Sequence, residues 1–151
     1  MHRALPALLA ALASGPALTQ NLIDATDPEA ILNVATGFGS ASLSRDNLGD
    51  PYIEGRIEGR IYELFFYDCT DNANCRSLMF RASFDAEGYT VEHMNLWNKE
   101  QRFGKAYLNE AGDPVIEYDV NLYGGVTFTN FDDTFDWWRI VLDKFAGYVK
   151  Y

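Results

Sequence analysis

The stretch that decides the fold of this chain runs from Asn95 to Thr127 and reads NLWNKEQRFGKAYLNEAGDPVIEYDVNLYGGVT. It predicts the end of a helix, two strands joined by a turn, and a glycine pair at which the last helix opens. We expect the strands over Phe103 to Leu108 and Val115 to Leu122. The segment between them, 109–114, holds the Asn, Gly, Asp and Pro residues that favour turns. The stretch therefore predicts a hairpin placed between two helices.

The chain before this stretch predicts a short helix, several strands and a second helix. After a polar lead-in over 21–26, Asp27-Pro28-Glu29 suits a helix start. This helix carries one apolar stripe, formed by Ile31, Val34, Ala35 and Phe38. Period-two alternation and turn clusters predict strands over 41–45, 53–57, 60–67 and 76–84. The second helix is expected over 90–101, with Val91, Met94 and Trp97 on one side.

These elements indicate the α+β class, with a mainly antiparallel sheet and N-terminal, middle and long C-terminal helices. The last helix is expected to start at Thr129, with Asp132 in a capping-box-like position. Its main apolar seam, which we expect to cover the sheet, is Phe131, Phe135, Trp138, Leu142, Phe145 and Val149.

A second stripe on the last helix consists of Trp137, Val141 and Tyr148 and is interrupted by Lys144. One stripe is enough to bury a helix on a sheet, so the second one needs another partner. One alternative is a deeply buried helix, with Trp137 tucked under the first helix. The other is a protein–protein surface, because tryptophan and tyrosine are preferred anchors of such surfaces.

Three short motifs carry a resemblance to a known family: Asn95-Leu96-Trp97-Asn98, Arg102-Phe103-Gly104-Lys105-Ala106-Tyr107 and Gly124-Gly125-Val126-Thr127. Together they resemble the signature of the YbjN-domain family, and a looser likeness extends from about Asp27 to Trp138. The resemblance implies a bacterial protein described as a sensory-transduction regulator. It also implies a fold similar to the type III secretion chaperones, whose members commonly pair as dimers.

The start of the chain is built like a secretory signal. His2-Arg3 supply positive charge, 4–13 is a short apolar run, and Ala11-Leu12-Ala13 is an A-x-A cleavage site. We therefore expect a signal peptide over 1–17, cleaved after about 13–20, and a single domain over 21–151 in the periplasm or secreted. The alternative is an Ala-rich first helix of the domain. The run is too short for stable membrane insertion.

Composition excludes some classes of partner. The net charge of −10 repels phosphate backbones, and no concentrated basic face is visible, so we expect no nucleic-acid partner. Aromatic residues make up 15% of the chain, an excess that favours a protein partner or a homodimer.

Cys69 and Cys75 are the only cysteines and lie between predicted antiparallel strands. Their spacing suits a structural disulfide across a hairpin tip in an exported protein. A redox pair usually has C-x-x-C spacing, and a zinc site needs further ligands. We therefore predict a disulfide worth about 2 kcal/mol.

No catalytic constellation is visible, and we expect neither cofactor nor metal. The acids Asp132, Asp133 and Asp136 fit a helix start better than a cation site. Asn95 and Asn98 either bind a ligand or hydrogen-bond the backbone where the second helix meets its strand. The sequence thus predicts a non-enzymatic binding protein acting through the last helix and an exposed face of the sheet. The alternative is a ligand binder or enzyme with a cleft near His93, Asn95 and Asn98.

Overall fold

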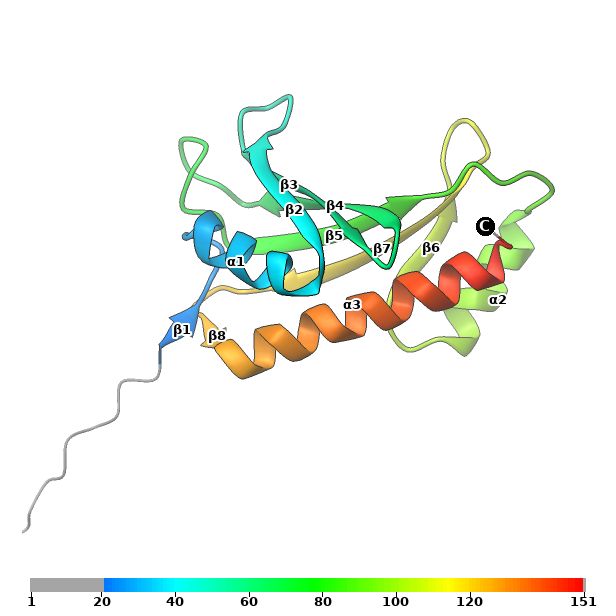
Figure 1. Cartoon of the computed structure of the whole chain (residues 1–151). Helices are drawn as coiled ribbons and strands as arrows, with labels where there is room; N and C mark the ends of the chain where they lie inside the picture. Colours follow the sequence, from blue (N-terminus) through cyan, green and yellow to red (C-terminus); the bar gives the residue numbers. More distant parts are fainter. Residues whose placement is uncertain (1–20, 151) are drawn as a thin grey trace, which may run out of the picture.

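A computed structural model describes residues 21–150 and combines a curved sheet with three helices (Figure 1). The predicted signal peptide falls on 1–17, outside the described residues. Along the chain the elements are β1 (Leu22–Ile23), α1 (Pro28–Phe38), β2 (Ser40–Arg45), β3 (Pro51–Ile57), β4 (Arg60–Tyr67), β5 (Ser77–Ser83), α2 (Val91–Glu100), β6 (Lys105–Leu108), β7 (Pro114–Asn121), β8 (Val126–Thr127) and α3 (Phe128–Tyr148).

The main sheet has six strands in the order β2-β3-β4-β5-β7-β6, and every neighbouring pair is antiparallel. The long helix α3 runs along one face of this sheet, with α1 near one of its ends and α2 near the other (Figure 1). This arrangement confirms the predicted α+β class with a mainly antiparallel sheet and three helices. The order of the predicted elements is also correct, with two short strands added.

The predicted seam of α3 forms the centre of the core. All six of its residues are buried, and Trp138 stacks on Phe80 of β5 with 5.3 Å between ring centroids. Tyr62 of β4 meets both Trp138 and Phe135 edge-on. The Tyr62 ring lies against Gly55 of β3, where a Cβ atom would collide with it. The missing side chain at Gly55 therefore makes room for a core ring.

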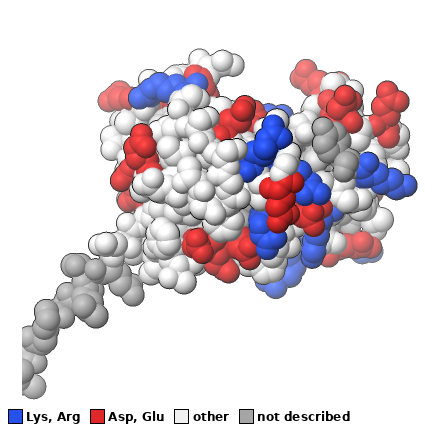
Figure 2. Space-filling model, in the orientation of Figure 1, with Lys and Arg blue, Asp and Glu red and all other residues white. Residues whose placement is uncertain are grey.

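The β3–β4 hairpin curls toward α3 and is joined to it by ion pairs. Arg60 lies 3.0 Å from Asp143, and Arg139 lies 3.4 Å from Glu58. Figure 2 shows acidic and basic side chains interleaved in this region. Because these side chains are partly or largely exposed, water screens both pairs and each adds little to stability. Their main effect is to fix the path of the hairpin.

Two expectations near the ends of the domain are wrong. The 21–26 segment is not merely a polar lead-in, because Leu22–Ile23 pairs with Val126–Thr127 in a separate two-stranded sheet. The last helix begins two residues earlier than predicted, with Thr127 as its N-cap. The Thr127 hydroxyl accepts a hydrogen bond from the Asn130 amide at 3.2 Å. A strand of two residues has no periodicity, so its pairing cannot be read from local sequence.

The apolar side of α2 is shorter than predicted. Met94 and Trp97 are buried, but Val91 is 60% exposed. Val91 is the first residue of the helix. Periodicity places it on the Met94 side, but no neighbouring element covers the helix end. Of the side predicted to hold Val91, Met94 and Trp97, the structure therefore buries only Met94 and Trp97.

Candidate protein-binding groove

The connection from α2 to β6 is held by a side chain of the family-like motif. The Asn98 amide donates to the Ala106 carbonyl at 3.0 Å, and its oxygen accepts from the Ala106 amide at 2.8 Å. Of the two roles considered for Asn98, hydrogen bonding to the backbone is the one observed. These two hydrogen bonds, called the Asn98 clasp below, fix the start of β6 and hence the position of the loop over 101–104.

Gly104 allows the same loop to lie close to the core. Its φ of +82° is in the left-handed region, and a Cβ atom there would come within 2.8 Å of side-chain atoms of Ile116 and Val141. Only glycine fits both requirements without strain. The loop consequently presses Phe103 against the side of α3.

Phe103 meets Trp137 of α3, and together they form the floor of a groove. Their ring centroids are 4.8 Å apart at an interplanar angle of 52°. The groove has a volume of about 240 Å³, and Ile140 of α3 and Trp97 of α2 also line it. Both floor rings are only half-buried, so apolar surface remains open to a ligand. Trp137 of the second stripe therefore meets this loop, whereas Tyr148 of the same stripe packs on α2.

The rim of the groove carries more positive than negative charge. Arg102 and Lys144 lie on it together with Glu100. The Arg102 guanidinium sits over the Phe103 ring, 5.3 Å from its centroid. Among residues 21–150, neither Arg102 nor Lys144 has an ion-pair partner. An aromatic floor with unpaired cations suits an apolar side chain flanked by carboxylates.

The three residues of the second stripe occupy different environments. Trp137 is half-buried in the groove and is not tucked under α1, so that alternative for its position is wrong. Val141 is only 5% exposed and belongs to the core. The Tyr148 hydroxyl donates to the His93 carbonyl at 2.9 Å, while its ring packs on Trp97. Of the predicted surface, Trp137 alone remains as an open anchor, because the loop over 101–104 covers Val141.

The three polar residues of the predicted cleft, His93, Asn95 and Asn98, have separate roles. The His93 ring accepts a hydrogen bond from the Thr90 amide at 3.1 Å, which places it at the capped start of α2. Asn95 is exposed, and Asn98 is engaged with Ala106. Two of the three polar groups therefore serve the helix and its connection, and the structure does not bring a base and a nucleophile together there.

Lys105 and Tyr107 belong to a charge network on the outer face of the sheet. The Lys105 ammonium lies 2.9 Å from Glu117, and the Tyr107 hydroxyl donates to the same carboxylate at 2.6 Å. The hydrogen bond to Glu117 raises the pKa of Lys105, and burial raises the pKa of the Tyr107 phenol. Lys105 thus balances the charge of the buried Glu117 carboxylate, and Tyr107 gives the same carboxylate a hydrogen bond.

The last motif shapes the entry into α3. Gly124 and Gly125 both have positive φ, of +84° and +81°, and make the bend that precedes β8. A Cβ atom on Gly125 would come within 2.9 Å of Leu22, which pairs with Thr127. The glycine pair therefore serves the bend and the β1–β8 contact, in line with its interpretation as a tight turn.

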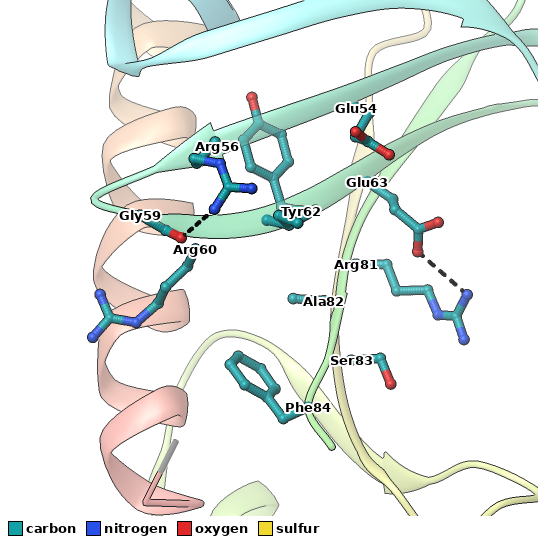
Figure 3. A pocket seen from close by; sticks show the side chains of 11 residues that line it. Glu54, Arg56, Gly59, Arg60, Tyr62, Glu63, Arg81, Ala82, Ser83 and Phe84 are labelled. Atoms are coloured by element: carbon teal, nitrogen blue, oxygen red, sulfur yellow. Dashed lines mark hydrogen bonds and ion pairs between the residues drawn. The ribbon is translucent and has the colours of Figure 1, made fainter. Parts of the chain in front are cut away.

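A second hollow opens where β4 and β5 part, a feature that sequence patterns did not indicate. Their pairing ends at Glu63 and Arg81, although both strands continue. A cleft of about 290 Å³ lies there, with Arg56 and Arg60 on the hairpin side (Figure 3). Arg81 contacts Glu63 at 3.5 Å, and Arg60 pairs with α3. Most of its cations are already engaged, so the groove beside Trp137 is the stronger candidate site.

The predicted disulfide between Cys69 and Cys75 is present. The loop that it closes is also anchored by Asn72, whose amide donates to the Leu48 carbonyl and to Asp50, both at 2.9 Å. The bridge closes the β4–β5 connection, and the Asn72 contacts join this connection to the β2–β3 turn.

Other classes of site find little support. Within 21–150, His, Cys, Asp and Glu form no group of three or more suited to a metal ion. None of the described helices is both long and apolar enough to cross a bilayer.

Comparison with known proteins identifies the family. The family model described as "YbjN: Putative bacterial sensory transduction regulator" matches residues 27–150, a span that contains all three motifs. Among curated proteins, none matches this chain. The match covers most of the chain, and the chain therefore belongs to the YbjN family.

Proposed function

We propose that this protein is an exported, non-enzymatic adaptor that acts in regulation by binding another protein in the groove beside Trp137. The observation that carries the proposal is an aromatic floor, formed by Phe103 and Trp137, in a groove also lined by two cations that have no ion-pair partner within residues 21–150. Family membership supports the regulatory part, because the family is described as one of regulators rather than enzymes. The leader-like residues at the start of the chain support export.

The chemistry of the groove indicates the kind of partner segment that it receives. Trp137 and Phe103 offer ring surface to one apolar side chain, and the volume of about 240 Å³ suits one or two such groups. Arg102 and Lys144 favour carboxylates on either side of it. Because the chain as a whole carries a net charge of −10, this local positive rim distinguishes the groove from most of the surface.

The test is a crosslinking pull-down from the envelope fraction, followed by titration of the captured protein against purified variants. Trp137→Asp is the disruptive variant, because it places a carboxylate on the apolar floor. Val91→Asp is the matched control, since Val91 is exposed and apolar but lies on α2 outside the groove. We expect Trp137→Asp to weaken binding at least tenfold, the effect of a lost interface anchor. Equal affinities for both variants would overturn the proposal.

A small-ligand role is the second candidate, favoured by the aromatic floor and the cations of the same groove. Its volume lies just below the roughly 300–1,000 Å³ of ordinary ligand pockets. A small aromatic carboxylate would meet the same floor and cations. If the pull-down captures no protein while phenylacetate, used as a probe, binds the native chain but not Trp137→Asp in titration calorimetry, this second role replaces the first.

The predicted likeness to secretion chaperones and the location in the periplasm remain part of the proposal. Fractionation of cells that express the full chain tests the location directly. An envelope signal that disappears when 1–17 are removed would support export. A signal that stays with the cytosol in both cases would contradict it.

A further inference from the structure

Helix α2 begins with a capping pair in which the acceptor is a histidine. Thr90 is the N-cap residue, and the ring of His93, three residues later, accepts a hydrogen bond from the Thr90 amide at 3.1 Å. In a capping box this acceptor is commonly glutamate or glutamine. Here it is the Nδ1 atom of an imidazole, which loses its lone pair when it binds a proton.

Only the neutral ring can serve as this acceptor. When Nδ1 of His93 accepts a hydrogen bond, the single ring proton is on Nε2. Protonation of Nδ1 places an N–H opposite the Thr90 N–H, so this hydrogen bond is lost. The Thr90 hydroxyl, 3.2 Å from Nδ1, can still accept from the charged ring, but the Thr90 amide loses its partner. A positive charge in the first turn also opposes the helix dipole.

His93 is the group at this helix start that titrates near neutral pH. It is exposed and is the only histidine in the span 21–150. Histidine is the residue type that changes charge between about pH 5 and 8. Tyr89 from the preceding loop faces the His93 ring, and Tyr148 from α3 contacts its carbonyl. Phenols stay neutral over this range.

The charged group nearest to the ring is the carboxylate of Glu92. A hydrogen bond from Thr90 lowers the pKa of Glu92, so this carboxylate keeps its charge from neutral to mildly acid pH. Its constant charge favours the protonated ring and offsets part of the effect of the helix dipole. The lost hydrogen bond to the Thr90 amide is therefore the main consequence of protonation.

The start of α2 is connected to the groove beside Trp137. The Tyr148 hydroxyl of α3 donates to the His93 carbonyl at 2.9 Å. One turn further along α2, Trp97 packs on Tyr148 and Phe145, and it also lines the groove. Loosening of the first turn of α2 therefore weakens the contact between α2 and α3 that holds one wall of the groove.

We propose that His93 acts as a pH-sensitive switch, which caps α2 near neutral pH and releases the cap in mild acid. The neutral ring stabilises α2, and this contribution is lost as the pH falls through the range in which imidazoles titrate. The consequence for the free chain is a looser α2. A second consequence, weaker partner binding in acid, rests on the proposed function of the groove.

The test is hydrogen exchange of the full chain, followed by mass spectrometry at about pH 7.5 and about pH 5.5. His93→Gln is the matched control, because its side-chain oxygen accepts from the Thr90 amide but does not titrate. Comparison of the two chains at the same pH removes the effect of pH on exchange chemistry. We expect equal protection of α2 near neutral pH and about fivefold lower protection of the native chain in acid, the effect of a lost cap.

His93→Ala checks that the cap itself is responsible, since it should show the lower protection of α2 at both pH values. The same protection in the native and His93→Gln chains at acid pH would overturn the proposal, whether it stays high or falls in both.

Binding of the captured partner is measured separately at the two pH values. The affinity of the native chain should fall in acid, and that of His93→Gln should not. A change in exchange without this change in affinity would overturn the link between the cap and the groove. If no partner is captured, the proposed function fails, and the exchange experiment still decides whether His93 is a switch.

Discussion

Trp137 and Trp138 are neighbours in the chain but lie in different regions of the molecule. Trp138 is fully buried, stacked on Phe80, and its indole N–H has no hydrogen-bond partner among the described residues. Trp137 is half-buried against Phe103 and faces a groove rimmed by cations. The same residue type thus serves the core at one position and an open surface at the next. A second apolar stripe on a helix that covers a sheet is therefore available for binding only where the neighbouring loop leaves it exposed.

The largest expected effect comes from truncating the buried member of the pair. Trp138→Ala should lower the free energy of unfolding by about 3–5 kcal/mol, because it removes ring contacts and leaves a cavity in the core. Trp138→Phe is the control: it keeps a ring against Phe80 and removes an N–H that has no partner, so it should cost clearly less. Urea denaturation measures both. A small effect of Trp138→Ala would contradict its place at the centre of the core.

The next effect concerns the loop that separates the two environments. Asn98→Ala removes both hydrogen bonds to Ala106 and leaves its backbone groups unpaired, which should cost about 1–3 kcal/mol. The loss should also weaken partner binding, because the clasp positions Phe103. Asn95→Ala, on the exposed side of the same helix, should change neither quantity. Similar effects of the two alanines would contradict the structural role of the clasp.

A smaller effect on stability is expected at the open member of the pair. Trp137→Ala loses a ring contact with Phe103 worth about 0.5–1.5 kcal/mol, together with the apolar area that a half-buried ring covers, and should cost clearly less than Trp138→Ala. Its effect on partner binding should be the greater of the two. If Trp137→Ala lowered the free energy of unfolding as much as Trp138→Ala does, Trp137 would belong to the core and would not be an open binding surface.

The smallest effect concerns Tyr118, whose ring lies between Phe80 of the core and Phe103 of the groove. Burial raises the pKa of the Tyr118 phenol, and the carboxylate of Asp133 raises it further. The neutral phenol is therefore favoured by folding, and this contribution is complete below about pH 10. It is lost as the pH rises through the folded pKa. We expect Tyr118→Phe to make the alkaline loss of stability shallower, as measured by chemical denaturation between neutral and strongly alkaline pH. An unchanged slope would contradict a raised pKa at this ring.

Regular patterns allowed much of the fold to be predicted. The seam of α3 repeats over five turns, β3 and β4 alternate, and turn residues bound the apolar runs of β5 and β7, so the existence and order of these elements follow from local sequence. The disulfide followed from two cysteines separated by a short polar loop between strands. These features depend on residues close together in the chain.

The groove and the short sheet depend on contacts between distant residues. Trp137 meets Phe103 only because Asn98 and Gly104 fix the path of the loop, and neither spacing nor composition encodes that path. The pairing of Leu22 with Thr127 is equally nonlocal. The second stripe of α3 was recognised from its periodicity, but burial of Val141 depends on the same loop. The cation-rimmed groove therefore became visible only in the folded structure.

Site-specific photo-crosslinking in cells tests directly whether the groove beside Trp137 holds a protein partner. The photoreactive residue p-benzoylphenylalanine is placed at Ile140, which lines the groove, and at Ile61, which is exposed on the opposite face of the sheet. We expect one discrete crosslinked adduct from position 140 and no adduct of that mass from position 61. The yield of the adduct from position 140 should fall when Lys144→Glu reverses a charge on the rim. An equal adduct from both positions, or one from position 61 alone, would contradict a partner in the groove.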